Sequence, residues 1–114
     1  MVNEKHPEIV TLCGSTKFKE QYLEMQKSLT LEGKIVLSCG LFNHADGETL
    51  TETQKEMLDE LHLRKIDLSD SIYVIDFDNY IGQSTKNEIS YAKSKGKKIK
   101  FYSQEKIRQM ENKW

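Results

Sequence analysis

The residue of this sequence whose type and position best suit catalysis is Glu88. It follows an apolar run at residues 72–75 and a polar segment that contains Gly82, Ser84 and Thr85, which supply turn and helix-capping chemistry. A buried parallel strand followed by such a loop and a helix is the junction at which open α/β sheets bind ligands. An ionised carboxylate there is suited to attack the anomeric carbon of a sugar or to stabilise an oxocarbenium ion. If Ser84 caps the helix, Glu88 lies about one turn into it and the helix dipole would help keep the carboxylate ionised. The alternative is a first-turn acid that has no function.

A second loop with binding potential follows the β-rich run at residues 8–13, which ends at Cys13. The loop residues are Gly14, Ser15, Thr16 and Lys17. A glycine lets the backbone approach an anion, hydroxyl groups donate to it, and the start of the following helix favours negative charge. A phosphate or a sugar hydroxyl would fit, although the loop matches neither a Walker A sequence nor a dinucleotide-binding fingerprint. The alternative is that Ser15 or Thr16 only caps the helix.

Other titratable residues offer weaker hypotheses. Asp76 and Asp78 follow the third predicted strand at the same sheet edge, and a Mg²⁺-dependent phosphohydrolase that uses them is one alternative. Their spacing matches no metal-ligand motif, so we expect no metal and no cofactor. His62 lies in a helix with an apolar stripe, where a packed histidine is commoner than a catalytic one. Cys13 and Cys39 are predicted to be reduced thiols, and a cysteine nucleophile paired with a histidine remains an alternative.

Composition excludes several classes of protein. A chain of 114 residues is long enough for one core, so we predict a single domain over residues 1–114. Its 17 basic and 18 acidic residues nearly cancel, which argues against a nucleic-acid polymer or a membrane surface as partner. No apolar stretch approaches the length of about 20 residues that a membrane helix needs, and residues 1–5 lack a signal-peptide core. We therefore expect a cytoplasmic protein.

The spacing of apolar residues along the chain alternates between that of strands and that of helices, and these elements must position the candidate residues. Strands are predicted at residues 8–13, 34–38, 72–75 and 98–102, with helices between them and a final helix at 105–113. Residues 40–47 are expected to be irregular, and Thr51 is expected to open a long helix. Its predicted apolar stripe consists of Met57, Leu58, Leu61, Leu63 and Ile66. Alternating strands and helices predict a three-layer α/β/α sandwich around a parallel sheet of about four to five strands.

Three segments together resemble the nucleoside 2-deoxyribosyltransferase-like superfamily. They are Leu12-Cys13-Gly14-Ser15, the strand between Asp70 and Asp76, and residues 82–92 with their Glu-Ile-Ser-Tyr-Ala core. The resemblance covers about residues 8–102. The superfamily includes nucleoside 2-deoxyribosyltransferases and 2'-deoxynucleoside 5'-phosphate N-hydrolases, and Glu88 falls on their nucleophilic glutamate.

The resemblance implies a flavodoxin-like or Rossmann-like fold in which Glu88 attacks C1' of a deoxyribosyl group and expels the base. The two loops would bind a 5'-phosphate through Ser15, Thr16, Lys17 and Ser84. Relatives assemble their sites across subunit contacts, so a homodimer or larger homo-oligomer is expected. Relatives carry a catalytic aspartate eight residues before the position of Asp70, where this chain has His62. A histidine could act as acid or base there, and Asp59 or Asp67 could take the role instead.

The sequence therefore predicts an N-glycosidic bond hydrolase or transferase that acts on a nucleoside or its 5'-monophosphate. The predicted catalytic residues are Glu88 and His62. The predicted substrate-binding residues are Cys13, Gly14, Ser15, Thr16, Lys17, Asp76, Gly82, Ser84 and Thr85. The alternative is a module that binds a nucleotide or sugar phosphate without turning it over.

Overall fold

A computed structural model describes residues 6–111 of the chain, with side chains for residues 6–106. Four strands form one parallel sheet in the order β2-β1-β3-β4. They are β1 (Ile9–Gly14), β2 (Ile35–Leu37), β3 (Ser71–Ile75) and β4 (Lys98–Phe101). Every predicted strand is present, and each strand end lies within one residue of its predicted position. Because all strands run the same way, the loops after β1 and β3 emerge at one edge of the sheet.

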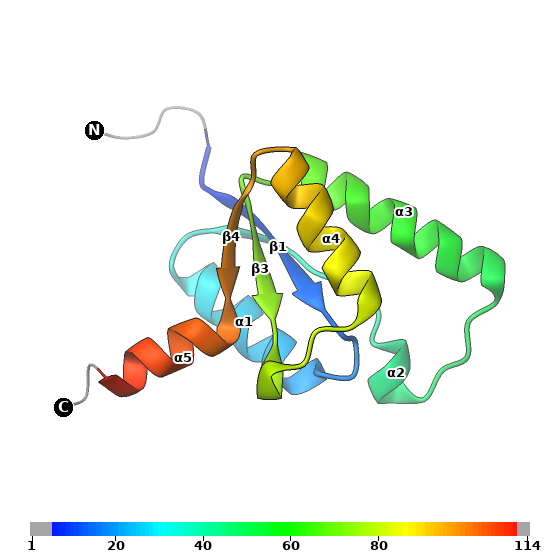
Figure 1. Cartoon of the computed structure of the whole chain (residues 1–114), viewed down its shortest axis with the longest axis horizontal. Coiled ribbons are helices and arrows are strands. Elements are labelled where there is room, and N and C mark those ends of the chain that lie inside the picture. The colour runs from blue at the N-terminus through cyan, green and yellow to red at the C-terminus, as the bar shows by residue number, and fades with distance from the viewer. Residues whose placement is uncertain (1–5, 112–114) are drawn as a thin grey trace.

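Helices cover both faces of this sheet, which confirms the three-layer α/β/α prediction (Figure 1). On one face lie α1 (Lys19–Leu31) and α5 (Tyr102–Glu111). On the other face lie α3 (Glu52–Leu68) and α4 (Gln83–Ser94). None of the helices within residues 6–111 is long and apolar enough to cross a membrane.

The core is divided by the sheet into two clusters of buried side chains. The cluster on the α1 and α5 face contains Val10, Leu12, Phe18, Tyr22, Met25, Leu29, Tyr73, Ile75 and Tyr102. The cluster on the α3 and α4 face contains Cys13, Ile66, Ile72, Val74 and Ala92. Strand β3 is buried at all five positions because it is central and covered on both faces, as its continuous apolar sequence predicts.

Helix α3 begins as the sequence predicts but buries a different face. Thr51 and Gln54 form a capping box, in which each side chain bonds the backbone N–H of the other. The predicted apolar stripe is wrong in part, since Met57 is 52% exposed and Leu61 is 46% exposed, while His62 and Ile66 are buried. The N-terminal part of α3 extends beyond the sheet, so its apolar residues have less to pack against (Figure 1).

Two further differences arise from tertiary contacts. The segment predicted to be irregular contains a one-turn helix, α2 (Asn43–Asp46), that ends at Gly47 with a positive φ of 69°. The last helix begins at Tyr102 and not at residue 105, because the Asp76 carboxylate accepts hydrogen bonds from the backbone N–H and the hydroxyl of Ser103 (2.8 and 2.7 Å). Residues 112 and 113 of that predicted helix, and residues 1–5, lie outside the described residues.

Candidate functional site

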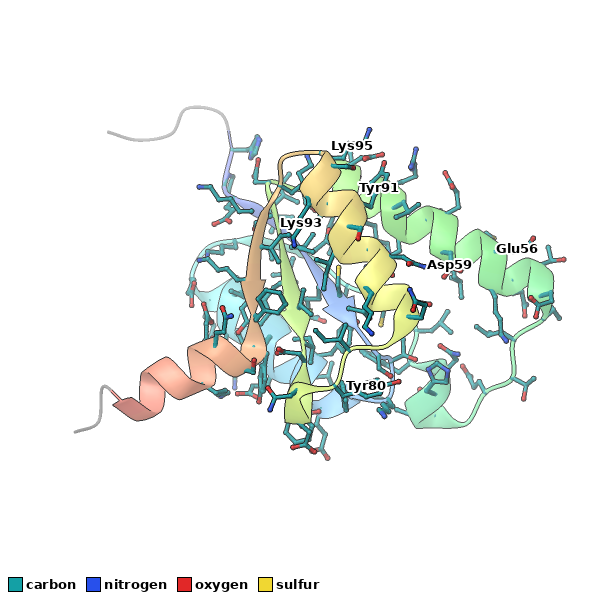
Figure 2. All side chains as sticks on the ribbon, in the orientation of Figure 1. Glu56, Asp59, Tyr80, Tyr91, Lys93 and Lys95 are labelled. Atoms are coloured by element: carbon teal, nitrogen blue, oxygen red, sulfur yellow. The ribbon has the colours of Figure 1, made fainter. Side chains whose placement is uncertain are left out.

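A cavity of about 410 Å³ opens at the sheet edge where β1 and β3 end. Its walls come from the loop after β1, the segment around α2, the first half of α3 and the start of α4. The lining residues predicted from the sequence are Gly14, Ser15, Thr16, His62, Gly82, Ser84, Thr85 and Glu88. Tyr80, in the loop before α4, and Asp59, on α3, also line it, and both are labelled in Figure 2. Segments far apart in the sequence therefore meet at the edge where an open α/β sheet binds ligands.

Three polar side chains meet at the bottom of this cavity, each from a different element. Glu88 of α4 places its Oε1 atom 3.6 Å from Nε2 of His62 on α3. The same Nε2 atom lies 3.4 Å from Sγ of Cys13 at the end of β1. The side chains of His62 and Glu88 are 11% and 16% exposed, and Cys13 is fully buried beneath them. The two predicted catalytic residues are thus in contact with each other.

Burial raises the pKa of Glu88 to about 7. A hydrogen bond from the Cys13 thiol acts in the opposite direction, and the charge of Asp59 adds to the rise. The expectation that the helix dipole keeps this acid ionised is wrong. The cap of α4 is Gly82 and not Ser84, so Glu88 lies beyond the first turn, where the dipole effect has faded and desolvation dominates.

The pKa of His62 is shifted in the opposite direction to that of Glu88. Burial, assisted by the charge of Lys65, lowers its pKa to about 4, so the imidazole is neutral at pH 7. Lys65 is held nearby because its Nζ atom donates to the carbonyl oxygen of Ser38 (2.7 Å). Burial also raises the pKa of Cys13 well above its ordinary value, which keeps it a thiol and argues against an activated cysteine nucleophile.

The loop after β1 is fixed by its own short contacts. Gly14 has a φ of 143°, and a Cβ atom there would lie 2.8 Å from the carbonyl oxygen of Ile75, so glycine is required. The Tyr22 hydroxyl donates to the carbonyl oxygen of Gly14 (2.8 Å). The Thr16 hydroxyl lies 2.7 Å from Nδ1 of His44. The cap position of α1 is Phe18, and no described side chain bonds there, so neither Ser15 nor Thr16 is a helix cap.

The start of α4 forms another part of the cavity wall. Gln83, Ser84 and Thr85 are its first three residues and all line the cavity. Backbone N–H groups in the first turn of a helix have no partner within the helix. Among residues 6–106, no side chain caps this terminus, so its amide groups can bind an anion in the cavity.

Several predicted residues lie elsewhere. The ammonium group of Lys17 sits 3.9 Å from the centre of the Tyr80 ring and does not line the cavity. Asp76 is buried, and its two carboxylate oxygens bind Ser103, so it stabilises the start of α5. Asp67 accepts a hydrogen bond from the Tyr91 hydroxyl (2.6 Å) on the far side of the α3–α4 contact.

Sequence reasoning missed part of the cavity wall. Asn43 and His44 of α2 line it, together with Tyr22 from α1 and Leu58 from α3. One signal was present, since residues 40–47 form a glycine-bounded connection after a parallel strand, and such loops gather at the ligand-binding edge. The helical position of His44 beside Thr16 depends on long-range packing.

Comparison with models of known protein families, and with curated proteins, found no match to this chain. The resemblance to the nucleoside 2-deoxyribosyltransferase-like superfamily therefore rests on the residues quoted above.

Proposed function

We propose that this protein cleaves or transfers the N-glycosidic bond of a nucleoside or nucleoside 5'-monophosphate, with Glu88 as the nucleophile. One observation carries the proposal: a carboxylate that is only 16% exposed lines a cavity whose other lining residues offer hydroxyl and amide donors. With a pKa of about 7, about half of the Glu88 side chains are ionised at neutral pH. A poorly solvated carboxylate is a better nucleophile toward carbon than a fully hydrated one.

In the first step, a Glu88 oxygen bonds to C1' of the sugar while the C1'–N bond breaks and its electron pair goes to the base. The base must gain a proton as it leaves. Asp59 lines the cavity one helical turn before His62 and, in its protonated form, is the better candidate for the acid that relatives carry at the position of His62. Asp67, the other alternative, does not line the cavity and accepts a hydrogen bond from Tyr91.

In the second step, water or another base attacks C1', and Glu88 leaves as a carboxylate. A neutral His62 beside Glu88 can accept the proton of the attacking water, which suits its lowered pKa better than the acid role does. The donors of Ser15, Thr16 and the first turn of α4 suit a 5'-phosphate or the sugar hydroxyls.

The test is to incubate the protein with deoxy- and ribonucleosides and their 5'-monophosphates, with and without a second base, and to measure free base by chromatography. Glu88→Gln is expected to fold and to lower the rate by roughly 10³-fold or more. Asp67→Asn is the matched control, since it removes an acid from the same helix pair outside the cavity. An unchanged rate in Glu88→Gln would reject Glu88 as the nucleophile.

A second candidate is a module that binds the same ligands without turning them over. The replacement of the relatives' aspartate by His62, neutral at pH 7, favours this alternative because the leaving base loses its usual proton donor. A nucleotide that raises the melting temperature of the parent protein without release of base would support it.

A further inference from the structure

The side chains of Cys13, His62 and Glu88 supply three different metal-ligating atoms at one place. Their Sγ, Nε2 and carboxylate oxygen atoms all lie within 4.8 Å of one another. Within the described part of the chain, they are the one such group of three. The ligands come from β1, α3 and α4, so the spacing of the residues in the sequence gave no sign of the group.

Two of the three distances between these atoms match edges of a zinc coordination tetrahedron. Zinc binds sulfur at about 2.3 Å, imidazole nitrogen at about 2.0–2.1 Å and carboxylate oxygen at about 2.0–2.2 Å. Tetrahedral angles then place sulfur about 3.5 Å from nitrogen, and nitrogen about 3.4 Å from oxygen. The corresponding distances here are 3.4 Å from Cys13 to His62 and 3.6 Å from His62 to Glu88.

The charge and the surroundings of the group also suit a divalent cation. A Cys13 thiolate and a Glu88 carboxylate together offset two positive charges, and binding would release the thiol proton to solvent. Asp59 is close enough to act on the charge of Glu88 and adds negative potential. His62 and Glu88 line the cavity, which leaves a fourth coordination position open to water or a ligand.

We propose that Cys13, His62 and Glu88 bind Zn²⁺ with three protein ligands and one position open to the cavity. This inference departs from the expectation that the protein holds no metal, and it goes beyond the glycosidic proposal by giving the same carboxylate a second use. Zinc and a sugar carbon would compete for the same carboxylate oxygen of Glu88. Metal binding and nucleophilic attack by Glu88 would therefore exclude each other.

The test uses cobalt as a spectroscopic probe for zinc. Untagged protein, freed of metal with a chelator, is titrated with Co²⁺ and then with Zn²⁺. The parent is expected to give one equivalent of a thiolate-to-cobalt charge-transfer band in the near ultraviolet, which Zn²⁺ removes. Cys13→Ser is expected to lose the band, and Cys39→Ser, which removes the other cysteine, is expected to keep it.

Two further variants keep the test decisive if the buried Cys13→Ser substitution prevents folding. Glu88→Gln and His62→Gln are each expected to weaken Zn²⁺ binding by roughly 100-fold or more, because even the loss of an outer partner costs 10–100-fold. Asp67→Asn is expected to bind as the parent does. Absence of the charge-transfer band in the parent, or parent-like affinity in both Glu88→Gln and His62→Gln, would overturn the proposal. No nucleotide is used, so the result does not depend on whether base release is found.

Discussion

Helices α3 and α4 contact each other through two polar clusters that differ mainly in access to water. At the cavity, His62 and Glu88 lie 3.6 Å apart and are largely buried. Toward the other end of the helix pair, Asp67 contacts Tyr91 and Arg64, and all three side chains reach solvent. Both clusters pair an acid on one helix with a polar residue on the other.

Their pKa shifts have opposite signs for the two acids. A hydrogen bond from Tyr91 lowers the pKa of Asp67, as is usual for a solvated carboxylate with partners. Burial raises the pKa of Glu88 to about 7. Desolvation, and not the number of partners, therefore makes one cluster a candidate site and the other a surface contact. Substitutions in each cluster can test that distinction.

The largest expected effect on the pH dependence of stability is in Glu88→Gln. In this variant, His62 is the one residue of the His62–Glu88 pair that still gains or loses a proton. The folded pKa of His62 is about 4 and its ordinary value is 6.5, so the unfolded state binds more protons between these values. The stability of this variant should therefore rise with pH across that window by about 3 kcal/mol. Urea unfolding at a series of pH values measures it, and a flat profile would mean that His62 is not buried as a neutral group.

In His62→Gln, the change of stability with pH is expected to have the opposite sign. Glu88 then titrates alone, with a folded pKa of about 7 against an ordinary value of 4.5, so the folded state binds more protons in between. Stability should fall as pH rises through that window, again by about 3 kcal/mol. In the parent the two slopes oppose each other, and stability should change little between about pH 4.5 and 6.5. A parent profile that follows either single variant would contradict the pairing.

The rate of base release, if the proposed function holds, should depend on ionised Glu88. Below its pKa of about 7, kcat/KM is expected to fall about tenfold for each pH unit as the carboxylate gains a proton. Steady-state rates between about pH 5 and pH 9 would measure this. A rate that is constant down to about pH 5 would show that the carboxylate is better solvated than its burial indicates.

The smallest effect on stability and rate is expected in the solvent-exposed cluster of Asp67, Tyr91 and Arg64. Tyr91→Phe removes the hydrogen bond to Asp67, so the pKa of Asp67 should rise toward its ordinary value. The melting temperature and the rate of base release should stay as in the parent, because solvent replaces the lost partner. Nuclear magnetic resonance titration of the carboxyl group measures the pKa. A large loss of stability would show that exposure does not separate the two clusters.

The succession of strands and helices along the chain could be predicted from the sequence. The spacing of apolar residues and the turn residues act locally, so they can be read without the fold. The sequence identified Thr51 as the start of a long helix, the buried strand β3 and the two loops at the binding edge that contain Gly14 and Gly82. Glu88 was a candidate through its position after a buried strand and a loop, and the resemblance added His62.

How those residues behave depends on the packed structure. The contact of Cys13, His62 and Glu88, and the opposite pKa shifts of the last two, depend on burial by three elements far apart in the chain. The binding of Ser103 by Asp76, which moved that acid from the predicted site to a structural role, is likewise a long-range contact. Local sequence patterns carry propensity, whereas desolvation and long-range hydrogen bonds exist only once the chain has packed.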